Sequence, residues 1–63
     1  SVDMDSVREL CDRVVREKEQ LVRERGEASI GPLMGLVMEE LRGRVDGKVL
    51  SEILRDRIRQ LLS

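Results

Sequence analysis

Apolar residues recur at helical spacing in two segments of the chain, one on each side of a central stretch rich in glycine. Recurrence every three or four residues is typical of an amphipathic helix. We therefore predict helices over residues 6–25 and 46–62. The apolar stripe of the first, which Lys18 interrupts, consists of Val7, Leu10, Cys11, Val14, Val15, Leu21 and Val22. The stripe of the second consists of Val49, Leu50, Ile53, Leu54, Ile58, Leu61 and Leu62.

The start of the first helix has three candidate caps. Ser6 and Glu9 fit the capping-box pattern, in which two side chains satisfy backbone N–H groups of the first turn. Asp3 or Asp5 fits a slightly earlier start. With Ser6 as the cap, residues 1–5 form a linker.

The central stretch is bounded by residues that start and stop helices. It holds all five glycines and the only proline of the chain. Gly31-Pro32 fits a helix start because the missing N–H of proline costs nothing in a first turn. Gly43 fits its end, where a left-handed backbone favours glycine, and Asp46 fits the N-cap of the next helix. We predict a middle helix over residues 31–42.

The middle helix is apolar around most of its circumference, so we expect its neighbours to bury it. Gly35 in its interior costs about 1 kcal/mol relative to alanine. Gly31 and Gly35 have the GxxxG spacing that lets two helix backbones approach closely. We expect close packing against the first or third helix, rather than a ligand contact. The apolar residues concerned are Leu33, Met34, Leu36, Val37, Met38 and Leu41.

Three helices joined by short turns predict an all-α fold, a small antiparallel three-helix bundle. The chain has 63 residues, no aromatic residue and 40% charged residues, which suits a single helical domain (1–63) with an aliphatic core. A domain of this size buries only about 60% of its unfolded surface. We therefore expect modest stability. We also expect this chain to be a fragment of a larger subunit.

Composition argues against catalysis, export and membrane insertion. The chain has no histidine and no metal-ligand spacing, so we expect no catalytic residues, metal or cofactor in this domain. Cys11 cannot form an internal disulfide, and its apolar helical position predicts a buried, inert thiol. The uncharged run over residues 28–38 is short of the roughly 20 residues that span a bilayer, and no signal pattern is present. We expect a cytoplasmic protein.

Basic side chains concentrate near the C-terminus. Residues 1–41 carry six basic and ten acidic side chains, whereas residues 42–63 carry six basic and three acidic ones. Arg42, Arg44 and Lys48 lie beside a predicted helix N-terminus, which favours anions. Against a phosphate site there, an Asp46 cap would occupy the same donors, and loop cations are commonly only solvated. Without aromatic residues to stack on bases, any RNA contact should involve backbone and shape.

The run GPLMGLVMEELRGRVDGKVLSEIL resembles the signature at the end of the tail domain in tRNA-dependent amidotransferases, the GatB/YqeY family. Its residues are most similar to the E-type subunit of archaeal glutamyl-tRNA(Gln) amidotransferases, rather than to the B-type subunit of the bacterial and organellar enzyme. The likeness covers about residues 26–62. The signature consists of Gly31, Pro32, Gly35, Met38, Gly43 and Asp46, with apolar positions at Leu33, Val49 and Leu54.

The resemblance implies a non-catalytic tail that contacts the tRNA body while the parent complex converts Glu-tRNA(Gln) to Gln-tRNA(Gln). ATP and Mg would be bound elsewhere in the parent subunit, and an amidase- or asparaginase-like partner subunit would release ammonia. The signature glycines and Asp46 have packing and capping explanations, so we do not assign them to RNA. The alternative is a structural module that docks on its parent subunit without RNA contact; neither DNA nor membrane is expected as a partner. The candidate RNA contacts are Arg42, Arg44 and Lys48, with Arg25, Arg55 and Arg59 as further candidates.

Overall fold

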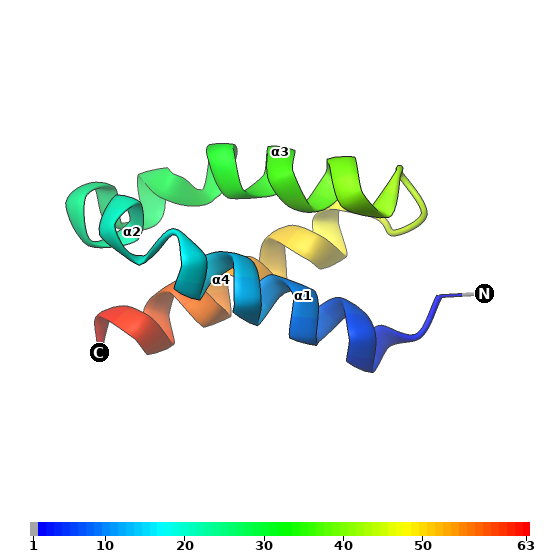
Figure 1. Cartoon of the computed structure of the whole chain (residues 1–63), viewed down its shortest axis with the longest axis horizontal. Coiled ribbons are helices and arrows are strands. Elements are labelled where there is room, and N and C mark those ends of the chain that lie inside the picture. Colours follow the sequence, from blue (N-terminus) through cyan, green and yellow to red (C-terminus); the bar gives the residue numbers. More distant parts are fainter. Residues whose placement is uncertain (1) are drawn as a thin grey trace.

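The computed structural model describes residues 2–63 as helices joined by short turns, with no strand among them (Figure 1). Successive long helices run in opposite directions, and each of the three contacts the other two. The prediction of an all-α, antiparallel three-helix bundle is confirmed, with the first helix divided into two parts. The elements are α1 (Met4–Glu17), α2 (Glu19–Arg25), the 3-10 turn η1 (Gly26–Ser29), α3 (Ile30–Leu41) and α4 (Gly47–Leu62).

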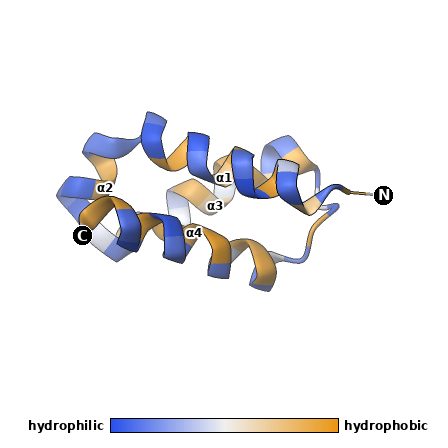
Figure 2. Cartoon of the chain, turned by 90° about the horizontal axis from the view of Figure 1, so that it is seen from below, coloured by the Kyte–Doolittle hydropathy of each residue, from blue (hydrophilic) through white to orange (hydrophobic). Residues whose placement is uncertain are grey.

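The core is a narrow column of aliphatic side chains between α1, α3 and α4. Figure 2 shows hydrophobic and hydrophilic positions alternating along α1 and α4 with the helical period. Each helix therefore contributes one stripe, as the periodicity predicts. The buried hydrophobic residues are Val7, Cys11, Val14, Val15, Val22, Leu33, Val37, Leu50, Leu54 and Ile58.

The helix expected over residues 6–25 is broken at Lys18, which has φ −106° and ψ 30°. Backbone hydrogen bonds continue across the break, because Lys18 N–H donates to Val14 and Val22 N–H donates to Lys18, each at 3.0 Å. In a straight helix, Lys18 would extend the buried stripe of Cys11 and Val14. The break turns its charged side chain into solvent while Val22 stays fully buried.

The first helix begins earlier than residue 6, with Asp3 as its N-cap. The Asp3 Oδ1 accepts the backbone N–H of Asp5 at 3.0 Å, and the Ser6 hydroxyl donates to Asp3 Oδ2 at 3.2 Å. The Asp3 alternative is therefore correct and the Ser6–Glu9 capping box is wrong. Met4 and Asp5, which we expected in a linker, are helical.

The last turn of α3 and the cap of α4 follow the sequence signals closely. Gly43 has φ 74°, as a left-handed position after the helix requires, but Arg42 before it is also left-handed at φ 54°. Arg42 N–H donates to the Met38 carbonyl at 2.8 Å. The Asp46 side chain accepts Lys48 N–H at 3.0 Å and caps α4.

The expectation that its neighbours bury the apolar circumference of α3 is wrong. Only Leu33 and Val37 are fully buried, whereas Leu36 and Met38 are 41% and 39% exposed. The helix begins at Ile30 rather than residue 31. A Cβ added at Gly31 or Gly35 would meet nothing within 4 Å, so the expected close packing of these glycines inside the domain is also wrong. One aliphatic column covers one side of α3 only.

Replacing Gly35 by alanine should stabilise this domain. The new methyl group meets no atom within 4 Å, and alanine favours the helix interior by about 1 kcal/mol. Thermal or urea unfolding of Gly35→Ala should therefore show a higher unfolding free energy. Gly26→Ala is the matched control: its site is equally open, but its φ of 58° disfavours an L-residue, so we expect a loss of about 1–3 kcal/mol. Equal effects at both glycines would contradict this explanation.

The Cys11 thiol should react only when the bundle opens. It is fully buried, and burial raises its pKa despite the opposing effect of the Arg57 guanidinium. An opening free energy of about 3 kcal/mol would leave roughly 1% of molecules reactive, so Ellman's reagent should label Cys11 about a hundredfold more slowly than it labels glutathione. Sub-denaturing urea should speed the reaction. Labelling at the rate of a free thiol would contradict the buried position.

Candidate nucleic-acid interface

The twelve basic side chains of the chain divide into two sets by their ion pairs. Within residues 2–63, one set pairs with carboxylates at distances of 2.8–3.4 Å. The other set has no carboxylate partner in the same part of the chain. The paired residues are Arg8, Arg13, Arg16, Arg23, Arg57 and Arg59. The unpaired residues are Lys18, Arg25, Arg42, Arg44, Lys48 and Arg55.

The α3–α4 turn brings three candidate RNA contacts to one end of the bundle. Arg42 and Lys48 are exposed. Arg44 is exposed too, and both its backbone N–H and its Nε donate to the Leu41 carbonyl at 3.1 Å, at the end of α3. Asp46 already accepts a backbone N–H at the α4 N-terminus. A phosphate would therefore meet the side chains of this turn, rather than the helix terminus itself.

Three candidates share one face of α4. Lys48, Arg55 and Arg59 follow each other at intervals of seven and four residues, which places them on the same side of a helix over about 16 Å. Arg55 is exposed and free of ion pairs within the described residues, whereas Arg59 lies 3.4 Å from Glu27 of η1. The exposed Glu52 interrupts this face. The face is basic, but it is not a continuous stripe of cations.

The remaining candidate, Arg25, lies in the last turn of α2. Figure 1 shows α2 and the end of α4 at the same end of the molecule, away from the α3–α4 turn. Arg25 therefore lies at the same end of the molecule as Arg59, in the last turn of α4, rather than with the cations of the turn. The six candidates are spread along the length of the bundle.

Lys18 is an unpaired cation that sequence reasoning missed. It lines a shallow groove between α1 and α3 together with Leu36 and Arg42. The available signal was its charge in the middle of an apolar stripe. Such a residue must either be paired or be turned out of the core, and the break before α2 turns it out.

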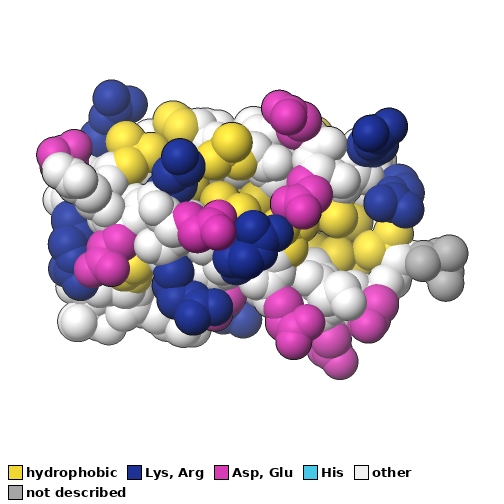
Figure 3. Space-filling view, in the orientation of Figure 1, with side chains coloured by type: hydrophobic (Ala, Val, Ile, Leu, Met, Phe, Trp, Pro, Cys, Tyr) yellow, Lys and Arg dark blue, Asp and Glu magenta, His cyan; other side chains and the backbone are white. Residues whose placement is uncertain are grey.

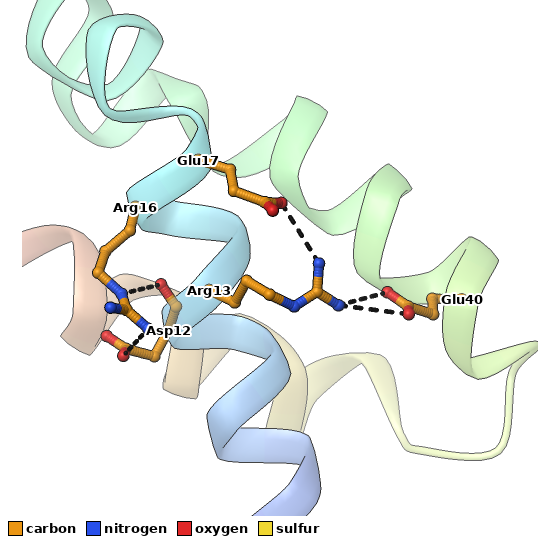
Figure 4. A network of polar contacts seen from close by, with 5 residues as sticks. All are labelled: Asp12, Arg13, Arg16, Glu17 and Glu40. Atoms are coloured by element: carbon orange, nitrogen blue, oxygen red, sulfur yellow. Dashed lines mark hydrogen bonds and ion pairs between the residues drawn. The ribbon is translucent and has the colours of Figure 1, made fainter.

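The groove between α1 and α3 is crossed by an ion pair between Arg13 and Glu40. Figure 4 shows Arg13 of α1 reaching toward α3, where its guanidinium lies 3.3 Å from Glu40 while also contacting Glu17 at 3.3 Å. Arg16 pairs with Asp12 on the outer side of α1 at 3.1 Å. Figure 3 shows acidic and basic side chains interspersed over this side of the molecule, with hydrophobic surface between them. This side therefore presents no basic patch.

Acidic side chains of the described residues do not gather into a metal-binding cluster. No group of three or more Cys, Asp or Glu side chains within residues 2–63 could hold a metal ion. Glu40 turns toward Arg13, so it does not converge with Glu39 on a common point. None of the helices over these residues is both long enough and apolar enough to cross a bilayer. The surface of the described residues does carry exposed basic side chains.

Comparison with known proteins gives one consistent family. The GatB domain family pattern matches residues 1–58. The E-type subunit of the glutamyl-tRNA(Gln) amidotransferase of Methanospirillum hungatei is 44% identical over 61 residues, which cover 97% of this chain and 10% of that protein. The same subunit of Methanosarcina barkeri is 49% identical over 84% of this chain and 8% of its own length. That of Methanopyrus kandleri is 56% identical over 73% of this chain and 7% of its own length.

The chain thus spans about a tenth of the length of these curated relatives. No solved structure matches it. The match with the family pattern covers nearly the whole chain, and the likeness to these amidotransferase subunits extends through the bundle from α1 to α4. The chain belongs to the GatB domain family.

Proposed function

We propose that this domain is the non-catalytic tail of the E-type subunit of a glutamyl-tRNA(Gln) amidotransferase and that it holds tRNA(Gln) through backbone and shape contacts. The observation that carries the proposal is the set of exposed cations without carboxylate partners, within the described residues, on the α3–α4 turn and on α4. Such side chains can bind phosphates without first breaking an ion pair. The names of the relatives supply the substrate class.

The chemistry of this surface suits RNA contacts that do not read bases. Arginine and lysine bind phosphate oxygens, and the chain has no aromatic side chain on which an unstacked base could stack. The overall charge of −1 provides no long-range attraction to nucleic acid. Binding would therefore depend on local cations, so we expect the isolated domain to bind weakly and the parent subunit to add most of the affinity.

The reaction itself would take place elsewhere in the parent complex. By resemblance, the complex converts Glu-tRNA(Gln) to Gln-tRNA(Gln) in the cytoplasm, using ATP and Mg in the parent subunit and ammonia from an amidase- or asparaginase-like partner. We infer that ATP and Mg are bound in another part of the parent subunit. Its role would be to position the tRNA body while the reacting end lies in another domain.

The alternative function is a structural module that docks on the parent subunit without RNA contact. The exposed Leu36 and Met38 of α3 favour some apolar docking. The salt dependence of binding distinguishes the two functions. Phosphate contacts release counterions and weaken steeply as salt rises, whereas apolar burial does not.

Removing two unpaired cations of α4 should weaken tRNA binding. Lys48→Gln with Arg55→Gln should lower the affinity for a tRNA(Gln) transcript, and the slope of log K against log salt should become shallower by about 0.7–0.9 for each phosphate that the variant no longer binds. Filter binding between low and moderate salt measures both quantities. Neither side chain makes a hydrogen bond or ion pair within the described residues, so the melting temperature should change little.

The matched control is Arg8→Gln with Arg16→Gln on α1. It removes the same charge, but both arginines are paired with aspartates. We expect its affinity and salt slope to stay close to those of the unsubstituted domain. If both double variants bound tRNA equally weakly, only net charge would matter. If both bound as tightly as the unsubstituted domain, the proposed RNA face would be wrong.

A further inference from the structure

The outer face of α3, defined as Gly31, Pro32, Gly35, Leu36 and Met38, is a feature that RNA contact does not explain. All five residues are exposed. Gly31, Pro32, Gly35 and Met38 lie on the side of the helix away from Leu33 and Val37, which are fully buried. Leu36 lies at the edge of this face, where it lines the groove between α1 and α3. A solvated helix normally carries charge on such a face, but no charged residue occurs from residue 28 to residue 38.

The two glycines point to a close neighbour outside the domain. A glycine inside a helix lowers its stability relative to alanine. No close contact within the bundle offsets this cost at Gly35, because a Cβ at this position would meet no atom within 4 Å. The same is true of Gly31. A flat stripe of this kind, with Leu36 and Met38 as ridges on either side, fits the side chains of a second helix.

We propose that the outer face of α3 is the docking site for an apolar helix from the remainder of the parent subunit. The relatives show how much chain is available: this domain matches only 10% of the length of the Methanospirillum hungatei protein. A helix in the same chain is present at millimolar effective concentration, so even a small face can hold it. The inference rests on the proposed place of this domain in a longer subunit, and it does not depend on RNA contact.

Charged residues at one end of the outer face of α3 indicate what the docking helix should carry there. Glu39 and Arg42 border its C-terminal end, and neither has an ion-pair partner within residues 2–63. The docking helix should therefore present small or aliphatic residues along most of its contact stripe. It should carry a basic residue near its end, opposite Glu39.

The other occupants fit this face less well. A second copy of the chain would need to bury about 800 Å² per partner for a stable dimer. That is roughly a fifth of the 4205 Å² that the whole chain exposes, more than the outer face of one short helix provides. RNA would need cations, which the face lacks over residues 28–38. A helix of the same subunit avoids both difficulties.

Cysteine labelling can test the proposal in a chimera. This chain would replace the matching segment of the Methanospirillum hungatei protein, and single cysteines would be placed by Gly35→Cys, or by Leu36→Cys at the edge of the face. Leu36→Cys is included because it still tests the face if a cysteine at position 35, the closest contact, prevents docking. Glu52→Cys on α4 is the control outside the face. Maleimide labelling of each site, read by peptide mass spectrometry, is compared between the chimera and the free chain.

We expect labelling at positions 35 and 36 to be about tenfold slower in the chimera, which corresponds to a docked state favoured by about 1.4 kcal/mol. Position 52 should label at the same rate in both. Slow labelling of the buried Cys11 in each sample shows that the domain is folded. Equal rates at positions 35 and 36 in the two contexts would overturn the proposal.

Two further results would assign the face to another occupant and also overturn the proposal. Protection of the free chain that grows with its concentration would indicate a second copy. Protection of positions 35 and 36 that appears only when tRNA(Gln) is added would indicate RNA. Position 52, which lies between Lys48 and Arg55, should respond to tRNA if the proposed function is correct. The two proposals can therefore fail separately.

Discussion

Burial of one stripe of α4 is the interaction on which the rest of the bundle depends. Leu50, Leu54 and Ile58 are fully buried, and α4 contacts every other helical element. Each of these side chains stabilises the fold by about 1.5–3 kcal/mol relative to an exposed position. Because the core has no aromatic side chain, it is a narrow column that only one stripe of each neighbouring helix can reach.

A narrow core has a direct consequence for the surface. The composition of α3 would suit burial on two sides, but the column of α4 covers only the side that carries Leu33 and Val37. The other side stays apolar and exposed, with two glycines that stabilise nothing inside the domain. The surface proposed to dock a helix is therefore a product of the same packing that forms the core.

The basic character of the α4 side depends on pairing as much as on the number of cations. Arginines of α1 and α2 are close to carboxylates one turn away, as in Arg16 with Asp12 and Arg23 with Glu19. Each such pair adds little stability at the surface. Pairing nevertheless occupies the guanidinium groups, whereas Arg55 keeps its donors free of any carboxylate within the described residues. Residues 1–41 and residues 42–63 each carry six basic side chains, but they present different surfaces.

Local signals in the sequence determined the helices, the left-handed Gly43 and the Asp46 cap, because these features depend on residues within about four positions of each other. The six candidate RNA contacts stay a prediction. Only the tertiary structure decided that Lys18 turns outward, that Arg59 pairs with Glu27 and that the Gly35 side of α3 stays open. These outcomes depend on which segments distant in the chain come into contact, and the periodicity of a single helix does not contain that information.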